Sequence, residues 1–136
     1  GDAMIRRLLV MTICFALLLP ALLLAAEEHG DNVPGMKEFH DVMAKMWHTY
    51  YPANDWASVR KDIGALQERA KKLQETKLTG DMAAKQETFD KTVAEMIKQI
   101  DLLVAACKKD DDEAVKKGVF DVHMAFHDMI SALYAK

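Results

Sequence analysis

The sequence predicts an all-α protein, an up-down-up-down antiparallel four-helix bundle preceded by a signal peptide. Three observations support this fold class. Apolar residues recur three and four positions apart in four successive segments, whereas no segment alternates with the two-residue period of a strand. Glycine and proline fall mostly between those segments, where turns are expected. Short connections make consecutive amphipathic helices antiparallel neighbours.

The N-terminal segment has the composition of an export signal. Two arginines follow Met4 closely, an apolar run covers 8–26, and two glutamates come next. A positive flank, an apolar centre and small residues before a polar start are the parts of a secretory signal peptide. We therefore predict a signal peptide over 4–26, cleaved after Ala26, and a periplasmic location. Residues 1–3 precede the methionine and are interpreted as a cloning remnant.

An uncleaved membrane anchor is the alternative interpretation of this segment. Its apolar run is close to the roughly 20 residues that span a bilayer as a helix. Pro20, near the end of the run, favours a cleaved signal instead. In either case the chain is expected to contact a membrane only through this segment.

The rest of the chain is expected to form one domain. A polar leader covers 27–33 and the helical bundle covers 34–136. A chain of this length supports a single modest core. The formal net charge of −3 gives no support for nucleic-acid binding, which usually requires a basic face. Cys14 falls in the signal, so Cys107 is left without an intramolecular partner and the fold depends on packing.

The first helix is expected over about 34–51. Asn32 is a candidate N-cap, Pro34 suits the first turn, and Pro52 ends the helix. One face of this helix is apolar, with a histidine among its members. That face holds Met36, Phe39, His40, Met43, Met46, Trp47 and Tyr50.

The other three helices follow from the same periodicity. The second begins at Trp56, after Asn54 or Asp55 as its cap, and the third covers about 81–108. The acidic turn at 108–113 caps the fourth helix. The expected inward stripe of the fourth helix contains Val115, Val119, Val122, Phe126, Ile130 and Leu133.

Histidines gather on the first and last of these helices. His40 and His48 lie on the first helix, His123 and His127 lie on the last, and the two middle helices have none. Because the first and last helices are neighbours in this topology, all four imidazoles are expected near one interface. Singly, a histidine at the edge of an apolar stripe most often has a structural role. Together they also fit a ligand site, because two histidines at i, i+4 can chelate one ion from one helix.

Heights along the bundle follow from the helical rise. A rise of about 1.5 Å per residue places His127 level with Met43 and His123 level with Trp47. The same estimate places His40 one turn nearer the end of the bundle. Methionine is most often a gap-filling core residue, but a methionine–histidine pair also suits haem iron or copper.

Residues 123–127 read His-Met-Ala-Phe-His, and this segment resembles the last helix of the cytochrome c-prime family. In that family a C-x-x-C-H motif attaches haem covalently and its histidine ligates the iron. The resemblance implies that His127 takes the ligand position. His123 and Phe126 stand where the two cysteines would be, so covalent attachment is not expected.

A haem-b relative of that family offers a closer parallel. It also lacks the cysteines, and an aromatic residue precedes its histidine, as Phe126 precedes His127 here. A methionine near the start of its first helix completes the iron coordination. The resemblance implies that Met43 or Met36 plays this part. It also implies that two copies pair through the first two helices.

The sequence therefore predicts an exported, non-enzymatic bundle that binds a cofactor between its first and last helices. One candidate is non-covalent haem b, with His127 and Met43 as ligands and Phe126 beside them. It would serve electron transfer or gas sensing with a redox partner. The other is a transition-metal ion such as copper or zinc, for storage, sensing or delivery. Its expected ligands are His127, His123, His40 and His48.

A cofactor-free bundle is the alternative function. It would act as a protein-interaction module in the cell envelope, with structural histidines and the aromatic turn at 50–56 as its contact surface. Other chemistry finds no support. The chain lacks the paired Glu-x-x-His motifs of di-iron bundles and any clear nucleophile, and Cys107 falls on an inward face.

Overall fold

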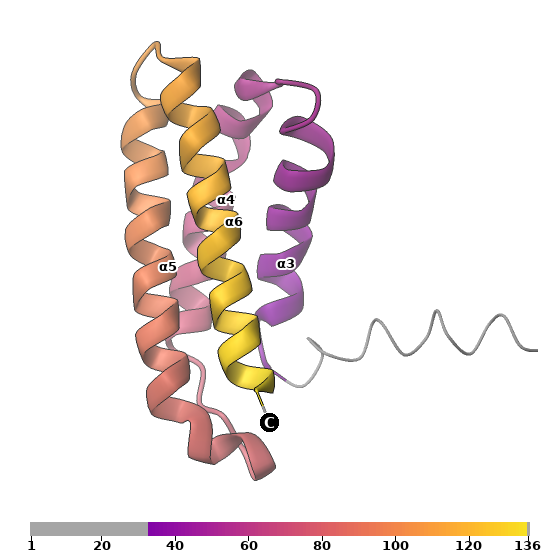
Figure 1. The fold of residues 1–136 in the computed structure, drawn as a ribbon, viewed down its shortest axis with the longest axis vertical. Coiled ribbons are helices and arrows are strands. Elements are labelled where there is room, and N and C mark those ends of the chain that lie inside the picture. The colour runs from indigo at the N-terminus through magenta and orange to yellow at the C-terminus, as the bar shows by residue number, and fades with distance from the viewer. Residues whose placement is uncertain (1–32, 136) are drawn as a thin grey trace, which may run out of the picture. The chain divides into compact units, whose positions relative to one another are not determined.

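The computed structural model describes residues 33–135, which form an all-helical bundle without a strand in that range (Figure 1). The predicted signal peptide at 4–26, the remnant at 1–3 and the leader up to Asn32 lie outside the described residues. Among the helices of the described part, none combines the length and the apolar character needed to cross a bilayer.

Four α-helices build the bundle. The helix α3 (Met36–Lys45) continues into the π-helical turn η1 (Met46–Tyr50), and α4 spans Trp56–Gln74. The 3-10 turn η2 (Gly80–Lys85) leads into α5 (Gln86–Cys107), and α6 spans Asp112–Tyr134. Consecutive helices run in alternate directions, and α5 and α6 make the most extensive contact (Figure 1).

The first helix starts two residues later than expected and changes its winding near its end. Gly35 precedes α3 with a positive φ of 84°, a conformation that glycine adopts without strain. In η1 the amide of Tyr51 donates to the carbonyl of Met46 at 2.9 Å. This five-residue spacing is the hydrogen bond of a π-turn, which contains one residue more than an α-turn.

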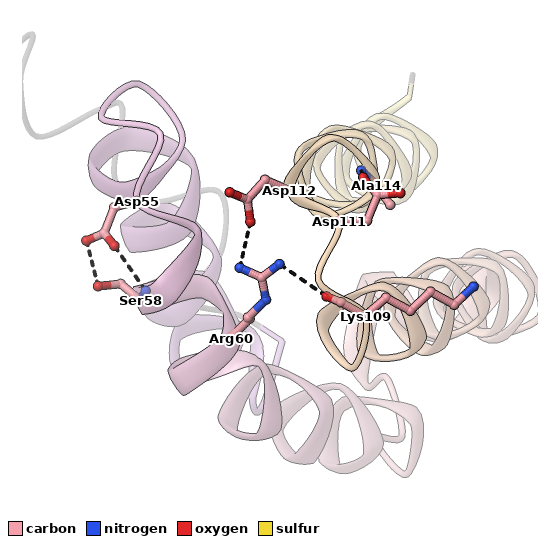
Figure 2. A network of polar contacts seen from close by, with 7 residues as sticks. All are labelled: Asp55, Ser58, Arg60, Lys109, Asp111, Asp112 and Ala114. Carbon is pink, nitrogen blue, oxygen red and sulfur yellow. Dashed lines mark hydrogen bonds and ion pairs between the residues drawn. The ribbon is translucent and has the colours of Figure 1, made fainter.

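Aspartates cap two of the helices, as the sequence predicts. Asp55, one of the two predicted caps of α4, accepts hydrogen bonds from the amide of Ser58 at 3.1 Å and from its hydroxyl at 2.6 Å (Figure 2). Asp111 accepts from the amide of Ala114 at 3.1 Å and caps α6. Each cap satisfies amides that a helix start leaves without a partner.

The turn between α5 and α6 is tied to α4 by an arginine (Figure 2). Arg60 donates to the Asp112 carboxylate at 2.8 Å and to the Lys109 carbonyl at 3.3 Å. At the other end of the bundle the Thr76 hydroxyl donates to the Pro34 carbonyl at 2.8 Å. These contacts fix the ends of helices that share a core.

The core is a continuous cluster of aliphatic, aromatic and thioether side chains. Phe39, Phe89, Leu66 and Leu103 are among its fully buried members, and five methionines also belong to it. Those methionines are Met36, Met43, Met46, Met96 and Met129. Polarizable, unbranched thioethers fill irregular gaps, so most of the methionine content is explained by packing.

The buried stripe of α6 differs in phase from the prediction. Phe126 and Ile130, which were expected in this stripe, are only partly buried. Ala125 and Met129 are buried in their place. The helix is therefore rotated so that Phe126 lies at the edge, facing α3.

Candidate metal-binding site

Aromatic contacts join α3 to α6 at the predicted interface. The rings of Phe39 and Phe126 stack with their centres 5.7 Å apart, and the imidazole of His40 lies 5.7 Å from the same Phe126 ring. The first and last helices are therefore neighbours, as expected. The height of His40 differs from the estimate, because this histidine lies beside Phe126 and not one turn nearer the end of the bundle.

Trp47, in the π-turn η1, is the centre of a second aromatic cluster. Its indole stacks on the imidazole of His123 with ring centres 3.7 Å apart and planes inclined by 6°. The ring of Tyr51 stacks at 4.6 Å, and the ring of Phe120 lies at 6.2 Å. The prediction that His123 lies level with Trp47 is thus confirmed. π-Turns frequently occur at functional sites, and this one positions both Trp47 and His48.

His123 and His127 lie together on α6. Their ring centres are 4.6 Å apart and the ring planes are inclined by 71°. Metal–nitrogen bonds of about 2 Å at an angle between about 90° and 110° place two imidazole centres roughly 4.5–5 Å apart. The pair therefore has the spacing of two ligands of one ion.

The electrostatics of His123 favour the neutral ring, which is the form that binds metals. Burial lowers the pKa of His123, and the charges of His127 and His48 lower it further. These effects also place His48 close enough to influence His123. His127, His48 and His40 are all exposed to solvent, whereas His123 is half-buried.

The two nitrogens of His123 have different surroundings. Its Nδ1 is buried and has no hydrogen-bond partner within residues 33–135. Burial of Nδ1 leaves Nε2 as the atom that a ligand reaches. Histidines in metal sites usually donate their second N–H to a carboxylate, a carbonyl or water, and that support is missing here. We therefore expect any metal at this histidine to be held in an exchangeable manner.

The interface between α3 and α6 is filled with side chains. Met43 is 1 % exposed and belongs to the core, and Phe39 is completely buried beneath Phe126. A haem between these helices would have to displace those rings, so the residues present do not fit the group in this packing. A surface pocket of about 530 Å³ lies elsewhere, between α5 and α6, and its lining includes Lys91 and Asp128 but none of the predicted site residues.

The histidine pair is an incomplete coordination sphere. In the described part of the chain, no three His, Cys, Asp or Glu side chains are grouped so as to hold a metal ion. Cys107 is not a suitable metal ligand either, because burial raises the pKa of its thiol and so disfavours the thiolate that binds metals. The arrangement offers one ion two nitrogen ligands and leaves the remaining positions open.

Two exposed apolar residues border the pair, and neither was predicted from the sequence as part of a site. Phe120 is 44 % exposed and Met124 is 43 % exposed. Together with His127 they follow the helical period of α6, as a second stripe outside the core stripe. That helical period is present in the sequence and is the signal that could have indicated these two residues.

A scan against models of protein families, a search of curated proteins and a search of solved structures each found no match to this chain. The resemblance to the cytochrome c-prime family therefore depends on residues 123–127, on a methionine of the first helix and on the helical plan, and it stays a prediction.

Proposed function

We propose that this protein is an exported metal-handling bundle that binds a copper or zinc ion through His123 and His127 of α6. The observation that carries the proposal is the 4.6 Å separation of the two imidazole centres, which suits two ligands of one ion. The i, i+4 spacing on a long helix holds that separation without help from a loop. In this proposal the fold is an up-down-up-down antiparallel bundle of cytochrome c-prime type, delivered to the periplasm by the signal at 4–26.

A bare ion is preferred to haem for a packing reason. Phe39, Phe126 and Met43 occupy the interface in which a haem would lie. The histidine pair, by contrast, lies on the solvent side of that interface and needs no displacement of the core.

Reversible binding and release of the metal ion is the role that this site supports best. The site offers two ligands from one chain, and Nδ1 of His123 lacks a supporting partner. Such a site releases its ion more readily than a closed four-ligand site, which fits delivery or sensing better than storage. The nearby thioether of Met124 favours copper, because soft sulfur ligands select Cu(I).

Tryptophan fluorescence tests the proposal directly. Cu²⁺ bound at His123 is expected to quench the stacked indole of Trp47. A Trp56→Phe background removes the other tryptophan, so that only Trp47 reports. His127→Gln is expected to weaken Cu²⁺ binding by more than about tenfold. Removing only a hydrogen-bond partner of a metal ligand already lowers metal affinity by about tenfold or more, and His127 is proposed as a ligand itself.

The matched control places the same side chain one turn further along α6. Ser131→Gln is exposed on the same face and is expected to leave the Cu²⁺ affinity unchanged. Equal affinities of the original protein and His127→Gln would refute the proposal. Addition of haemin forms the second arm, where a Soret band lost in His127→Gln would restore the haem interpretation.

A second candidate function is the envelope interaction module. It is favoured by the exposure of Phe120 and Met124 next to the half-buried Trp47. The aromatic turn at 50–56 is a poorer contact surface than expected, because Tyr50 and Trp56 are each 8 % exposed. Photo-crosslinking from position 120 in intact cells tests this function. A specific crosslinked protein, combined with failure to bind Cu²⁺ or Zn²⁺, would support it over metal handling.

A further inference from the structure

We infer that two copies of this chain complete the metal site, each contributing His123 and His127 of its α6 helix to one shared ion. The inference rests on the proposed metal-handling function and adds the partner that the site requires. It differs from the pairing through the first two helices that the family resemblance implies.

The first argument is the number of ligands. A zinc site usually has four ligands, and one copy supplies two at the required separation. No third His, Cys, Asp or Glu joins them as a metal-binding group within residues 33–135. The missing ligands have to come from solvent or from another molecule.

The second argument is symmetry. A two-fold axis brings the same surface of two copies together, so a residue pair on one copy meets the identical pair on the other. An ion on that axis beside α6 would receive two imidazoles from each helix. Four nitrogen ligands result, two from the α6 helix of each copy.

The third argument is the apolar border of the pair. Phe120 precedes His123 by three residues and Met124 precedes His127 by three, so both lie on the face that would meet the second copy. Both are more than two-fifths exposed in the single chain. Phenylalanine and methionine are enriched at protein interfaces, and burial of these side chains would stabilise the pair of chains.

The charges on α6 also favour a second copy of this chain as the source of the missing ligands. Asp128, adjacent to His127, is exposed and would be present twice near the shared dication. The cation offsets the repulsion between these two carboxylates, and the assembly is therefore expected to depend on the metal.

The experiment measures mass and metal content together. The purified chain is titrated with Zn²⁺, a redox-inert probe, and followed by analytical ultracentrifugation and native mass spectrometry. The inference predicts conversion from one chain to two, with one Zn²⁺ per two chains, and reversal by EDTA. His127→Gln should abolish the conversion, whereas Ser131→Gln and His48→Gln should preserve it. Phe120→Ala should raise the Zn²⁺ concentration needed for conversion.

The outcomes separate this inference from the function on which it rests. One Zn²⁺ bound by a single chain, with binding lost in His48→Gln, would overturn the shared site but leave the metal-handling function in place. A pair of chains that persists in EDTA and in His127→Gln would also overturn the shared site. Absence of Zn²⁺ and Cu²⁺ binding in both experiments would refute the inference and the proposed function together.

Discussion

Trp47 and His123 lie face to face, with 3.7 Å between their ring centres and only 6° between their planes. The contact joins the π-turn η1 to the middle of α6 and covers one face of the imidazole. It therefore couples the surroundings of a candidate metal ligand to the packing of two helices.

Stability is expected to fall in mild acid because of His123. Burial lowers the pKa of this histidine in the folded protein below its ordinary value of 6.5. The unfolded chain then binds the proton more readily, so the contribution of the neutral ring is complete above about pH 6.5 and is lost as the pH falls through that value. Urea unfolding between pH 8 and pH 5 should show this loss. His123→Gln should have a smaller pH dependence, and an equal dependence in both proteins would contradict the prediction.

Replacing Trp47 should loosen the contact between η1 and α6. Trp47→Leu removes stacking against His123 and Tyr51, and each aromatic pair contributes about 0.5–1.5 kcal/mol beyond its buried area. We expect the free energy of unfolding to decrease by about 1–3 kcal/mol. Leu102→Ala is the control, because Leu102 is 57 % exposed and its loss should change stability by less than about 0.5 kcal/mol. Denaturant titration at neutral pH measures both.

Two glycines within helices should respond oppositely to alanine. A Cβ at Gly118 would lie 3.3 Å from the Cα of Leu103 and 2.8 Å from its Cδ1, so α5 and α6 would have to separate. Gly118→Ala is expected to destabilise the protein by about 1–3 kcal/mol. Gly64 in α4 has no neighbour within 4 Å of such a Cβ, and Gly64→Ala should stabilise by about 0.5–1 kcal/mol. Thermal unfolding would disprove the account if both variants shifted the midpoint in the same direction.

The cap of α6 should contribute measurably to stability. Asp111→Ala removes the carboxylate that accepts from the Ala114 amide, and we expect a loss of about 1 kcal/mol. Asp110→Ala changes the same charge one residue earlier, outside the cap, and isolates the effect of the hydrogen bond. Denaturant midpoints that decrease equally in the two variants would attribute the loss to charge and not to capping.

The sequence was sufficient for the helices and for the level of His123. Helical periodicity located all four α-helices, and the Asp55 cap and the level of His123 with Trp47 were correctly expected. These features depend on local sequence or on the constant rise per residue along a helix axis. The contact between α3 and α6 followed from the order of the helices.

Details that depend on packing between helices were not predictable in this way. A small rotation of α6 moved Phe126 from the core centre to its edge, and the position of His40 differed by about one turn. Periodicity placed Met43 on the inward face of the first helix, but it does not report whether the neighbouring side chains leave room for a haem. The function and the cofactor stay predictions for the experiments above, and the export signal stays a prediction from the sequence.

The wide turn at Met46–Tyr50 also affects how the chain tolerates changes of length. Because this turn holds one residue more than an α-turn, deleting a single residue there would convert it to ordinary helix and leave α3 intact. A deletion inside α3 would instead rotate every residue that follows it by about 100°. Insertions and deletions among related chains should therefore concentrate in this turn. Chains with and without the extra residue should differ in whether Trp47 can stack on His123.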